Sequence, residues 1–316
     1  MSAGGDGHGT KAVLAALIAN ALIAVAKFVG FLVTGSSAML AESVHSVADS
    51  GNQGLLLLGG KRAKKAADEQ HPFGYGRERY FWAFVVALVL FSLGGVFSLY
   101  EGYHKLEEAS EGGELTSPGV AIAILLFAIV AEAFSFRTAI VESKKVKGDQ
   151  SWWRFVRTAK SPELPVVLLE DLGALVGLFL ALIGVGLAAV TGDLLWDALG
   201  TMSIGVLLLV IAVFLVIEMK ALLIGEGGTA TQVGQIRTAL VDGSAITRII
   251  HLKTTYLGPD ELLVAAKVGV APDLSVAELA TAINEAESRV RAAVPIARSI
   301  YLEPDLYRTP AEHSPA

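Results

Sequence analysis

Four polar residues recur on one face of an otherwise apolar segment. Glu42, His45, Asp49 and Asn52 are separated by three, four and three residues, so a helix of 3.6 residues per turn brings them onto one face. An imidazole and a carboxylate one turn apart can bind a common cation, and zinc, cobalt, manganese and iron accept both ligands. A lone polar residue in a membrane helix often serves only as a helix–helix hydrogen bond, whereas ionisable groups in register mark an ion pathway. The pattern therefore favours a metal site with His45 and Asp49 at its core.

A second acidic position lies much further along the chain. Glu170 and Asp171 are the only charged residues in the apolar run 164–191. Neighbouring residues of a helix point about 100° apart, so one carboxylate is expected to bind metal. The other is expected to face a polar interface, relay protons or support the ligands. The other polar residues of the apolar runs are expected to be structural or to support the ligands; they are Asn20, Lys27, Glu132 and Arg137.

The chain contains no cysteine. A disulfide framework and a thiolate metal site are therefore excluded, and imidazole, carboxylate, amide or water must hold any metal. No concentrated basic surface of the kind that binds nucleic acid is evident, so nucleic acid is not an expected partner.

These candidate ligands lie in a chain whose apolar residues are unevenly distributed. Of its 316 residues 53% are hydrophobic, and the mean hydropathy is +0.57. A membrane-spanning helix needs about 20 mostly apolar residues. Six runs meet this length, and we predict a six-helix transmembrane domain from them: 12–33, 38–60, 80–103, 118–141, 164–191 and 196–224. The first run is too long for a cleaved signal peptide.

The links between these runs differ in charge. Links 61–79 and 144–160 each contain six Lys or Arg residues, whereas link 107–115 contains four Glu residues. By the positive-inside rule the basic links are cytoplasmic, and six spans then place both termini in the cytoplasm. Trp152 and Trp153 suggest that the second basic link is an amphipathic segment at the membrane interface, with a disordered loop as the alternative.

The last third of the chain has the composition of a soluble domain. A helix is predicted over 232–241, strands over 245–256 and 261–270, a helix over 275–294 and a strand over 297–302. This αββαβ order predicts a small cytoplasmic α+β domain. The domain boundaries predicted from the sequence are a tail (1–11), a transmembrane domain (12–226), a C-terminal domain (227–305) and a disordered tail (306–316).

Three features together resemble the cation diffusion facilitator family. They are the HSVAD segment from His45 to Asp49, the HPFGYGR segment from His71 to Arg77, and the αββαβ domain that follows the last span. The resemblance covers residues 11–305, and the run 37–101 is most similar to the branch with an HSxxDxxNQ pattern. It implies a metallochaperone-like C-terminal domain through which two copies dimerise. It also implies export of a divalent metal from the cytoplasm by proton antiport.

The resemblance also implies a four-ligand transport site. His45 and Asp49 match the first ligand pair, and Asp171 matches one member of the second pair. Val167 stands at the remaining position and cannot bind metal. The missing ligand is then expected from Asn52, Glu42, Glu170 or water.

A second metal site is implied in the loop before the third span. Asp68 and His71 match its ligand positions, while Tyr75 stands where the family often has a histidine. His71-Pro72 is equally consistent with a simple restraint on the loop. The C-terminal domain contains only His251, so little metal binding is expected there.

Zinc is the first expectation for the cargo, because histidine favours zinc-like ions over hard cations. Imidazole titrates near neutral pH, so His45, with Asp49 and Asp171, is expected to couple metal to protons. Manganese, iron, cobalt or nickel are alternatives, and no resident cofactor is expected. A membrane metalloenzyme is less favoured because no HExxH motif is present, and a non-transporting scaffold is less favoured because the intramembrane acids would then have no evident use. High Ala, Gly and Val content without cysteine suggests a bacterial inner membrane, with an organelle membrane as the alternative.

Overall fold

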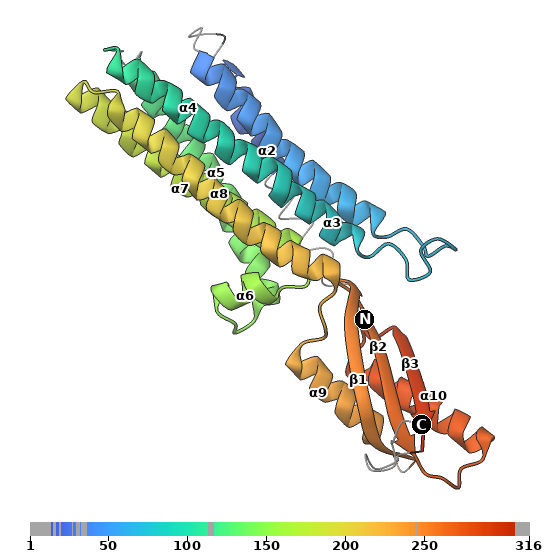
Figure 1. Cartoon of the computed structure of the whole chain (residues 1–316). Helices are drawn as coiled ribbons and strands as arrows, with labels where there is room; N and C mark the ends of the chain where they lie inside the picture. Colours follow the sequence, from blue (N-terminus) through green and yellow to red (C-terminus); the bar gives the residue numbers. More distant parts are fainter. Residues whose placement is uncertain are drawn as a thin grey trace, which may run out of the picture. The chain divides into compact units, whose positions relative to one another are not determined.

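The computed structural model describes residues 37–112, 117–243 and 245–306, together with 14, 17–18, 20–26, 28–29 and 32. The described residues divide into two compact units (Figure 1). The first holds the long helices as far as Lys220, without the loop Ala66–Arg77. The second holds that loop together with the chain from Ala221 onward.

The first unit consists almost entirely of long helices. They are α2 (Ser37–Arg62), α3 (Glu78–Val85), the π-helical turn η1 (Val86–Phe91), α4 (Ser92–Ser110), α5 (Pro118–Lys147), α7 (Glu163–Thr191) and α8 (Leu195–Ile224), with the short α6 (Trp152–Thr158) before α7. Pro118 lies in the first turn of α5, where its missing N–H is harmless. Gly192 ends α7 with a positive φ of 73°, a conformation that glycine adopts without steric cost.

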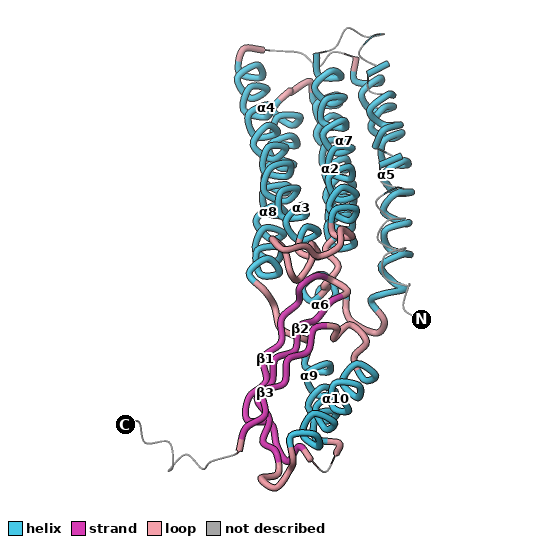
Figure 2. Tube along the Cα trace, turned by 90° about the vertical axis from the view of Figure 1, so that its right-hand side faces the viewer, coloured by secondary structure: helices cyan, strands magenta, loops and turns pink. Residues whose placement is uncertain are grey.

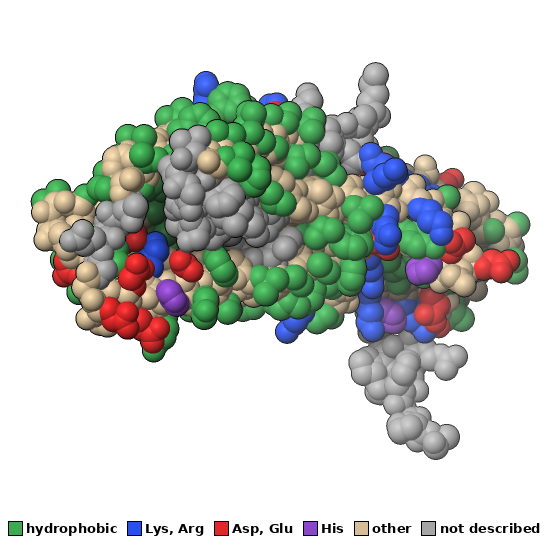
Figure 3. Space-filling model, turned by 90° about the horizontal axis from the view of Figure 1, so that it is seen from above, with side chains coloured by type: hydrophobic (Ala, Val, Ile, Leu, Met, Phe, Trp, Pro, Cys, Tyr) green, Lys and Arg blue, Asp and Glu red, His purple; other side chains and the backbone are tan. Residues whose placement is uncertain are grey.

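Four described helical segments are long and apolar enough to cross a membrane. They are Glu78–Ser110, which joins α3, η1 and α4, and the helices α5, α7 and α8. The described residues of the first predicted run are helical, and α2 covers the second run with its polar face. The total of six spans therefore stays a prediction. Large apolar side chains are widely exposed on this unit (Figure 3), as expected of a surface that faces lipid rather than water.

Glycines allow several of these helices to approach closely. A Cβ at Gly205 of α8 would lie 2.9 Å from the carbonyl oxygen of Gly95 in α4, and a Cβ at Gly184 of α7 would lie 2.8 Å from the carbonyl oxygen of Trp196 in α8. Small residues at such crossings are typical of membrane helix packing. The packing thus holds α4, α7 and α8 together.

The second unit contains α9 (Ala230–Val241), β1 (Ile246–Gly258), β2 (Glu261–Val270), α10 (Val276–Ala293) and β3 (Ser299–Asp305). The sheet order is β1-β2-β3, with β1 antiparallel and β3 parallel to β2. Figure 2 shows α9 and α10 on the same face of this sheet. Ile236, Leu240, Leu262, Val264 and Val290 are fully buried between the helices and the sheet. The prediction of a C-terminal α+β domain with αββαβ order is confirmed.

The loop Ala66–Arg77 packs against the β1–β2 turn within the second unit. A Cβ at Gly76 would lie 2.7 Å from the carbonyl oxygen of Leu257 and 3.0 Å from Cα of Gly258. Only glycine fits at this backbone contact. The sequence gives no sign that the link between two membrane helices belongs with the C-terminal domain.

Two further sequence predictions concern single segments. The second basic link contains the helix α6, whose N-cap Ser151 accepts a hydrogen bond from the Arg154 N–H at 3.2 Å. This segment is therefore ordered and not a disordered loop, and its position at the membrane interface stays a prediction. Of the tail predicted to be disordered, Leu306 is described and residues 307–316 lie outside the described residues.

Candidate functional site

The polar face of α2 is only partly visible. The backbone of α2 is helical from Ser37 to Arg62, so the spacing of Glu42, His45, Asp49 and Asn52 does put them on one face. The side chains of Glu42, His45 and Asp49 lie outside the described part of the structure. The site is therefore described from Asn52 and from the helices that pack beside it.

Asn52 and its neighbour Gln53 bind a buried carboxylate of α7. The Asn52 side-chain amide donates to Oε1 of Glu170 at 3.2 Å, and the Gln53 amide donates to the same oxygen at 2.6 Å. The side-chain amide of Asn20, in the first apolar run, donates to the amide oxygen of Gln53 at 3.5 Å. Asn52, Gln53, Glu170 and Asn20 are 3%, 0%, 6% and 7% exposed. We call these four residues the amide network, and it joins α2 to α7.

The amide network determines the orientation of the Asn52 side-chain amide. Because its NH2 group donates to Glu170, its oxygen points away from that carboxylate. The Asn52 Oδ1 atom is buried and accepts no hydrogen bond from the residues that are described. A buried amide oxygen is a strong acceptor that requires a partner, and a cation is one such partner.

Asp171 faces a different neighbour from Glu170. It is 1% exposed, and its Oδ2 accepts a hydrogen bond from the Ser135 hydroxyl of α5 at 2.9 Å. The α5 and α7 helices pack side by side. The divergence of the two carboxylates agrees with the rotation of about 100° between neighbouring helical residues. Val167, one turn before Asp171, is fully buried and apolar.

The residues with described side chains do not by themselves form a metal centre. Among them, no group of three or more His, Asp or Glu side chains could hold a metal ion. The side chains of Glu42, His45 and Asp49 are not among those described. The structure does bring together the carboxylate of Asp171, the carboxylate of Glu170 with its two amide donors, and the buried amide oxygen of Asn52.

Three contributors to this region are not predicted as metal ligands from the sequence. Gln53 adjoins Asn52 in the NQ pair, so the pattern gives a signal for it. Asn20 has only the weaker signal of an amide in an apolar run, and Ser135 has none, because serine is common in membrane helices.

A buried ion pair lies at the start of α3 and α7. Arg79 Nη2 donates to Glu163 Oε2 at 2.9 Å, with the two side chains 10% and 8% exposed. A second nitrogen, Nε, bonds the other oxygen of Glu163, so the contact is bidentate. Such a pair fixes the geometry of both groups, and it therefore anchors the first turn of α7 to α3.

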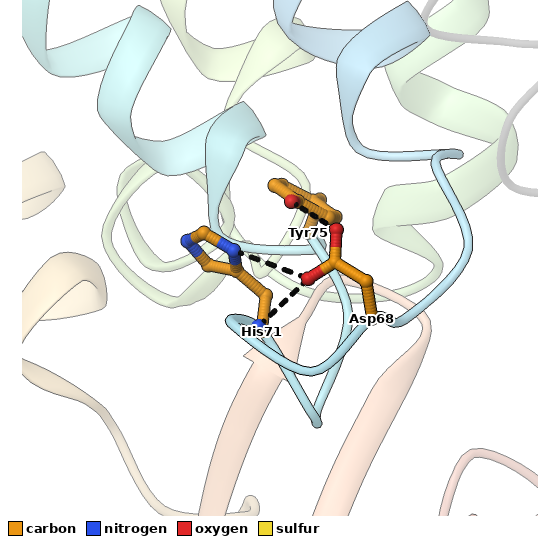
Figure 4. Close-up of polar contacts among 3 residues, drawn as sticks. All are labelled: Asp68, His71 and Tyr75. Carbon is orange, nitrogen blue, oxygen red and sulfur yellow. Dashed lines mark hydrogen bonds and ion pairs between the residues drawn. The ribbon is translucent and has the colours of Figure 1, made fainter.

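The loop residues Asp68, His71 and Tyr75 form a closed set of contacts (Figure 4). Asp68 accepts a bond from the His71 backbone N–H at 2.9 Å and from the Tyr75 hydroxyl at 2.6 Å. The His71 Nδ1 atom is 3.5 Å from Asp68 Oδ1, and the His71 and Tyr75 rings are 4.3 Å apart. Both carboxylate oxygens of Asp68 are therefore engaged within the loop.

Comparison with protein families gives one match across most of the chain. The cation efflux transmembrane domain matches residues 13–224. This match covers all four helical segments that are long and apolar enough to span a membrane, together with α2 and the amide network.

Curated relatives match over four-fifths of the chain. The proton-coupled zinc antiporter SLC30A9, mitochondrial, of Mus musculus is 32% identical over 262 residues, which are 82% of this chain and 45% of the relative. Metal tolerance protein C4 of Arabidopsis thaliana is 28% identical over 265 residues, or 83% of this chain and 57% of the relative. The chain thus spans about half the length of these relatives.

One solved structure overlaps the C-terminal part. It is a MamM C-terminal domain with two substitutions, at 19% identity and a TM-score of 0.23, covering 25% of this chain and 93% of the other.

The predicted location in a bacterial inner membrane is wrong. Relatives that match four-fifths of the chain are mitochondrial zinc antiporters of animals, and this finding overturns the prediction. Composition misleads here, because a high content of Ala, Gly and Val reflects helix packing in any membrane and carries no information on the compartment. The multi-pass membrane character stands.

The family match over two-thirds of the chain, the relatives above 30% identity, and the buried acids within membrane-spanning helices agree with one another. The chain belongs to the cation diffusion facilitator family, a family of cation efflux transporters and not of enzymes.

Proposed function

We propose that this chain moves a divalent cation, zinc first, across a membrane in exchange for protons. The proposal puts His45 and Asp49 of α2 and Asp171 of α7 at the transport site. The observation that carries it is Asp171, a carboxylate 1% exposed in a membrane-spanning helix. Ionisable groups at such depth are expensive to maintain, and in membrane proteins they mark ion pathways.

Of the candidates for the missing ligand, Asn52 has the most support. It lies three residues from Asp49 on the same face of α2, and its amide oxygen is buried. Glu170 is then a positioning residue that holds the Asn52 NH2 group and directs the amide oxygen toward the cation. The side chain of Glu42 lies outside the described residues.

Coupling to protons follows from the chemistry of the proposed ligands. Metal requires the neutral imidazole of His45 and the ionised carboxylates of Asp49 and Asp171, so protons and metal compete for the same atoms. Alternating exposure of such a site to the two sides of the membrane produces exchange of metal for protons. Zinc antiport by the mitochondrial relatives is consistent with this proposal.

Manganese is the second candidate cargo, and Val167 is the observation that favours it. An apolar residue at the fourth position leaves an oxygen-rich set of carboxylate, amide and water around one imidazole. Oxygen ligands and higher coordination numbers suit manganese better than zinc.

Two further roles are part of the proposal. The C-terminal domain joins two copies of the chain into a homodimer.

The metal site in the loop at Asp68 and His71 stays a prediction. A role as a restraint on the loop has more support, because both carboxylate oxygens of Asp68 already accept hydrogen bonds within the loop.

Transport by the full chain reconstituted in proteoliposomes tests the function. Zinc entry is measured with a trapped metal indicator, with and without an imposed pH gradient, and manganese is added as a competitor. We expect zinc flux to rise when the pH gradient drives protons in the opposite direction. We also expect a zinc gradient to drive protons against the direction of zinc movement. Zinc flux that is the same with and without the pH gradient would contradict antiport. Manganese flux that exceeds zinc flux would make manganese the transported ion.

A further inference from the structure

The short helix α6 and the end of α8 form an aromatic and basic corner of the first unit. The Trp153 ring centre lies 5.3 Å from that of Phe214, and Arg157 Nε lies 3.3 Å from Glu218 Oε1. Trp153 and Arg157 are four residues apart, as are Phe214 and Glu218, so the two contacts hold α6 alongside α8. We call this region the α6–α8 corner (Figure 1).

An exposed apolar stripe runs along α8 to this corner. Val206, Val210, Val213 and Ile217 follow one another at spacings of four, three and four residues, and they are 55%, 61%, 61% and 57% exposed. This spacing puts them on one face of the helix. Lys220 is exposed and continues the same face after three residues, so the stripe ends at a cation.

The corner itself carries a positive charge. Arg154, Arg157 and Lys220 are exposed, and Glu218 is the only carboxylate in α6 or in α8 from residue 214 to 220. The guanidinium of Arg157 also lies 5.9 Å from the ring centre of Trp153, a cation–π distance. Glu218 neutralises one of the three cations, which leaves a net charge of about +2 by this count of side chains.

The apolar stripe, the tryptophan and the cations follow one another in the same order as the tails, the interface and the headgroup of a phospholipid. An exposed apolar stripe on a membrane helix meets acyl chains, tryptophan prefers the interface between tails and headgroups, and lysine or arginine at that level attracts anionic lipid. We propose that the α6–α8 corner binds an anionic phospholipid. Its acyl chain lies along Val206–Ile217, and its phosphate meets the exposed cations at this end of the stripe.

A second copy of the chain fits this face less well than a lipid does. In a symmetric dimer the same patch meets itself, so the cations of the corner would face the cations of its partner. A lipid phosphate instead supplies the opposite charge. The inference does not depend on which metal is carried.

Native mass spectrometry of the full-length protein tests the binding. The protein is released from nanodiscs that contain equal amounts of phosphatidylglycerol and phosphatidylcholine, and the retained lipids are counted. A cation near the membrane surface contributes about fivefold to anionic-lipid preference. We therefore expect the double variant Arg157→Gln/Lys220→Gln to lower the preference for phosphatidylglycerol by at least about fivefold. The matched control Arg237→Gln/Arg298→Gln removes two exposed cations of the C-terminal domain and is expected to retain the preference.

Fluorescence quenching locates the lipid independently. Brominated phosphatidylglycerol should quench tryptophan emission more than brominated phosphatidylcholine does, and Trp153→Phe should remove most of that difference. Equal retention of both lipids by the wild type would overturn the proposal. So would an unchanged preference in the Arg157→Gln/Lys220→Gln variant, or a quenching difference that survives Trp153→Phe.

Discussion

Glu170 and Asp171 are neighbours in one helix, yet their partners lie on different helices. Glu170 accepts from the amides of Asn52 and Gln53 on α2, whereas Asp171 accepts from Ser135 on α5. The adjacency of the two acids is visible in the sequence, and so is their divergence. Which acid faces which helix depends on packing, and only the structure supplies it.

The amide network makes a direct prediction for Glu170. Glu170→Leu leaves the buried amides of Asn52 and Gln53 without their acceptor, and it frees Asn52 to rotate. We expect the zinc KM for transport to rise about 10- to 100-fold, the usual effect of losing a group that orients a ligand. Glu170→Gln retains an acceptor oxygen, so its KM should stay within about threefold of the wild type.

Transport assays in proteoliposomes compare these two variants at fixed pH gradient. A KM for Glu170→Leu equal to the wild-type value would rule out the positioning role. Loss of proton coupling in Glu170→Gln, with zinc binding intact, would instead make Glu170 a proton carrier.

Val167 gives a second prediction at the same scale. Val167→Asp adds a carboxylate one turn from Asp171, at the position where the proposed transport site lacks a ligand. We expect zinc to bind at least about tenfold more tightly and release to slow, since ligand number and charge set metal affinity. Isothermal titration of the detergent-purified protein measures the affinity.

Val166→Asp is the matched control for this change. Val166 is also fully buried, so both variants add the same charge to the interior, but the side chain at 166 points about 100° away. Tighter zinc binding in both variants, or in neither, would contradict the assigned vacancy.

At the scale of elements, the Arg79–Glu163 pair fixes the start of α7 against α3. Glu163→Leu removes one partner and leaves a largely buried guanidinium without its carboxylate. We expect a loss of about 3–5 kcal/mol of stability, measured as thermal unfolding in detergent. The double variant Arg79→Leu/Glu163→Leu should recover part of this loss, because the largely buried guanidinium is removed together with the carboxylate. A single variant as stable as the wild type would show that the pair does not anchor α7.

The capping box of α10 is a separate element with a pH dependence. Ser275 and Glu278 bond each other's backbone N–H groups at 3.3 and 2.8 Å, and the bonds from Ser275 lower the pKa of Glu278 below its ordinary value. The stabilisation is thus present above the ordinary glutamate pKa, and it is lost as pH falls through the lowered pKa.

Hydrogen exchange of the full-length protein reports on this cap. Ser275→Ala should cost about 1 kcal/mol, which corresponds to an exchange rate in the first turn of α10 about fivefold faster. The Thr229 cap of α9 is unchanged in this variant and serves as the internal control. Equal acceleration in both helices would indicate general destabilisation instead of the loss of one cap.

For the molecule as a whole, the sequence is informative wherever the pattern is local. The apolar runs predict helices α5, α7 and α8, and alternating residues predict the sheet, because hydrophobic periodicity reflects which face is buried. The π-helical turn Val86–Phe91 and the contact between Gly76 and Gly258 depend on tertiary packing, which no local pattern encodes. The spacing alone indicates the candidate ligands of α2, whereas the choice of Asp171 over Glu170 depends on the family resemblance. Ser135, which donates to Asp171 from a separate helix, has no sequence signal.

Zinc-driven proton flux in Asp171→Asn, with Asp193→Asn as control, tests the central claim most directly. Both changes replace a carboxylate by an amide of the same shape, but Asp193 is exposed and caps the start of α8, a bond that asparagine also forms. With equal amounts of protein in sealed proteoliposomes, we expect Asp193→Asn to retain wild-type flux and Asp171→Asn to lose it by about 100-fold or more. Zinc-driven proton flux at the wild-type level in Asp171→Asn would contradict the assignment of the transport site.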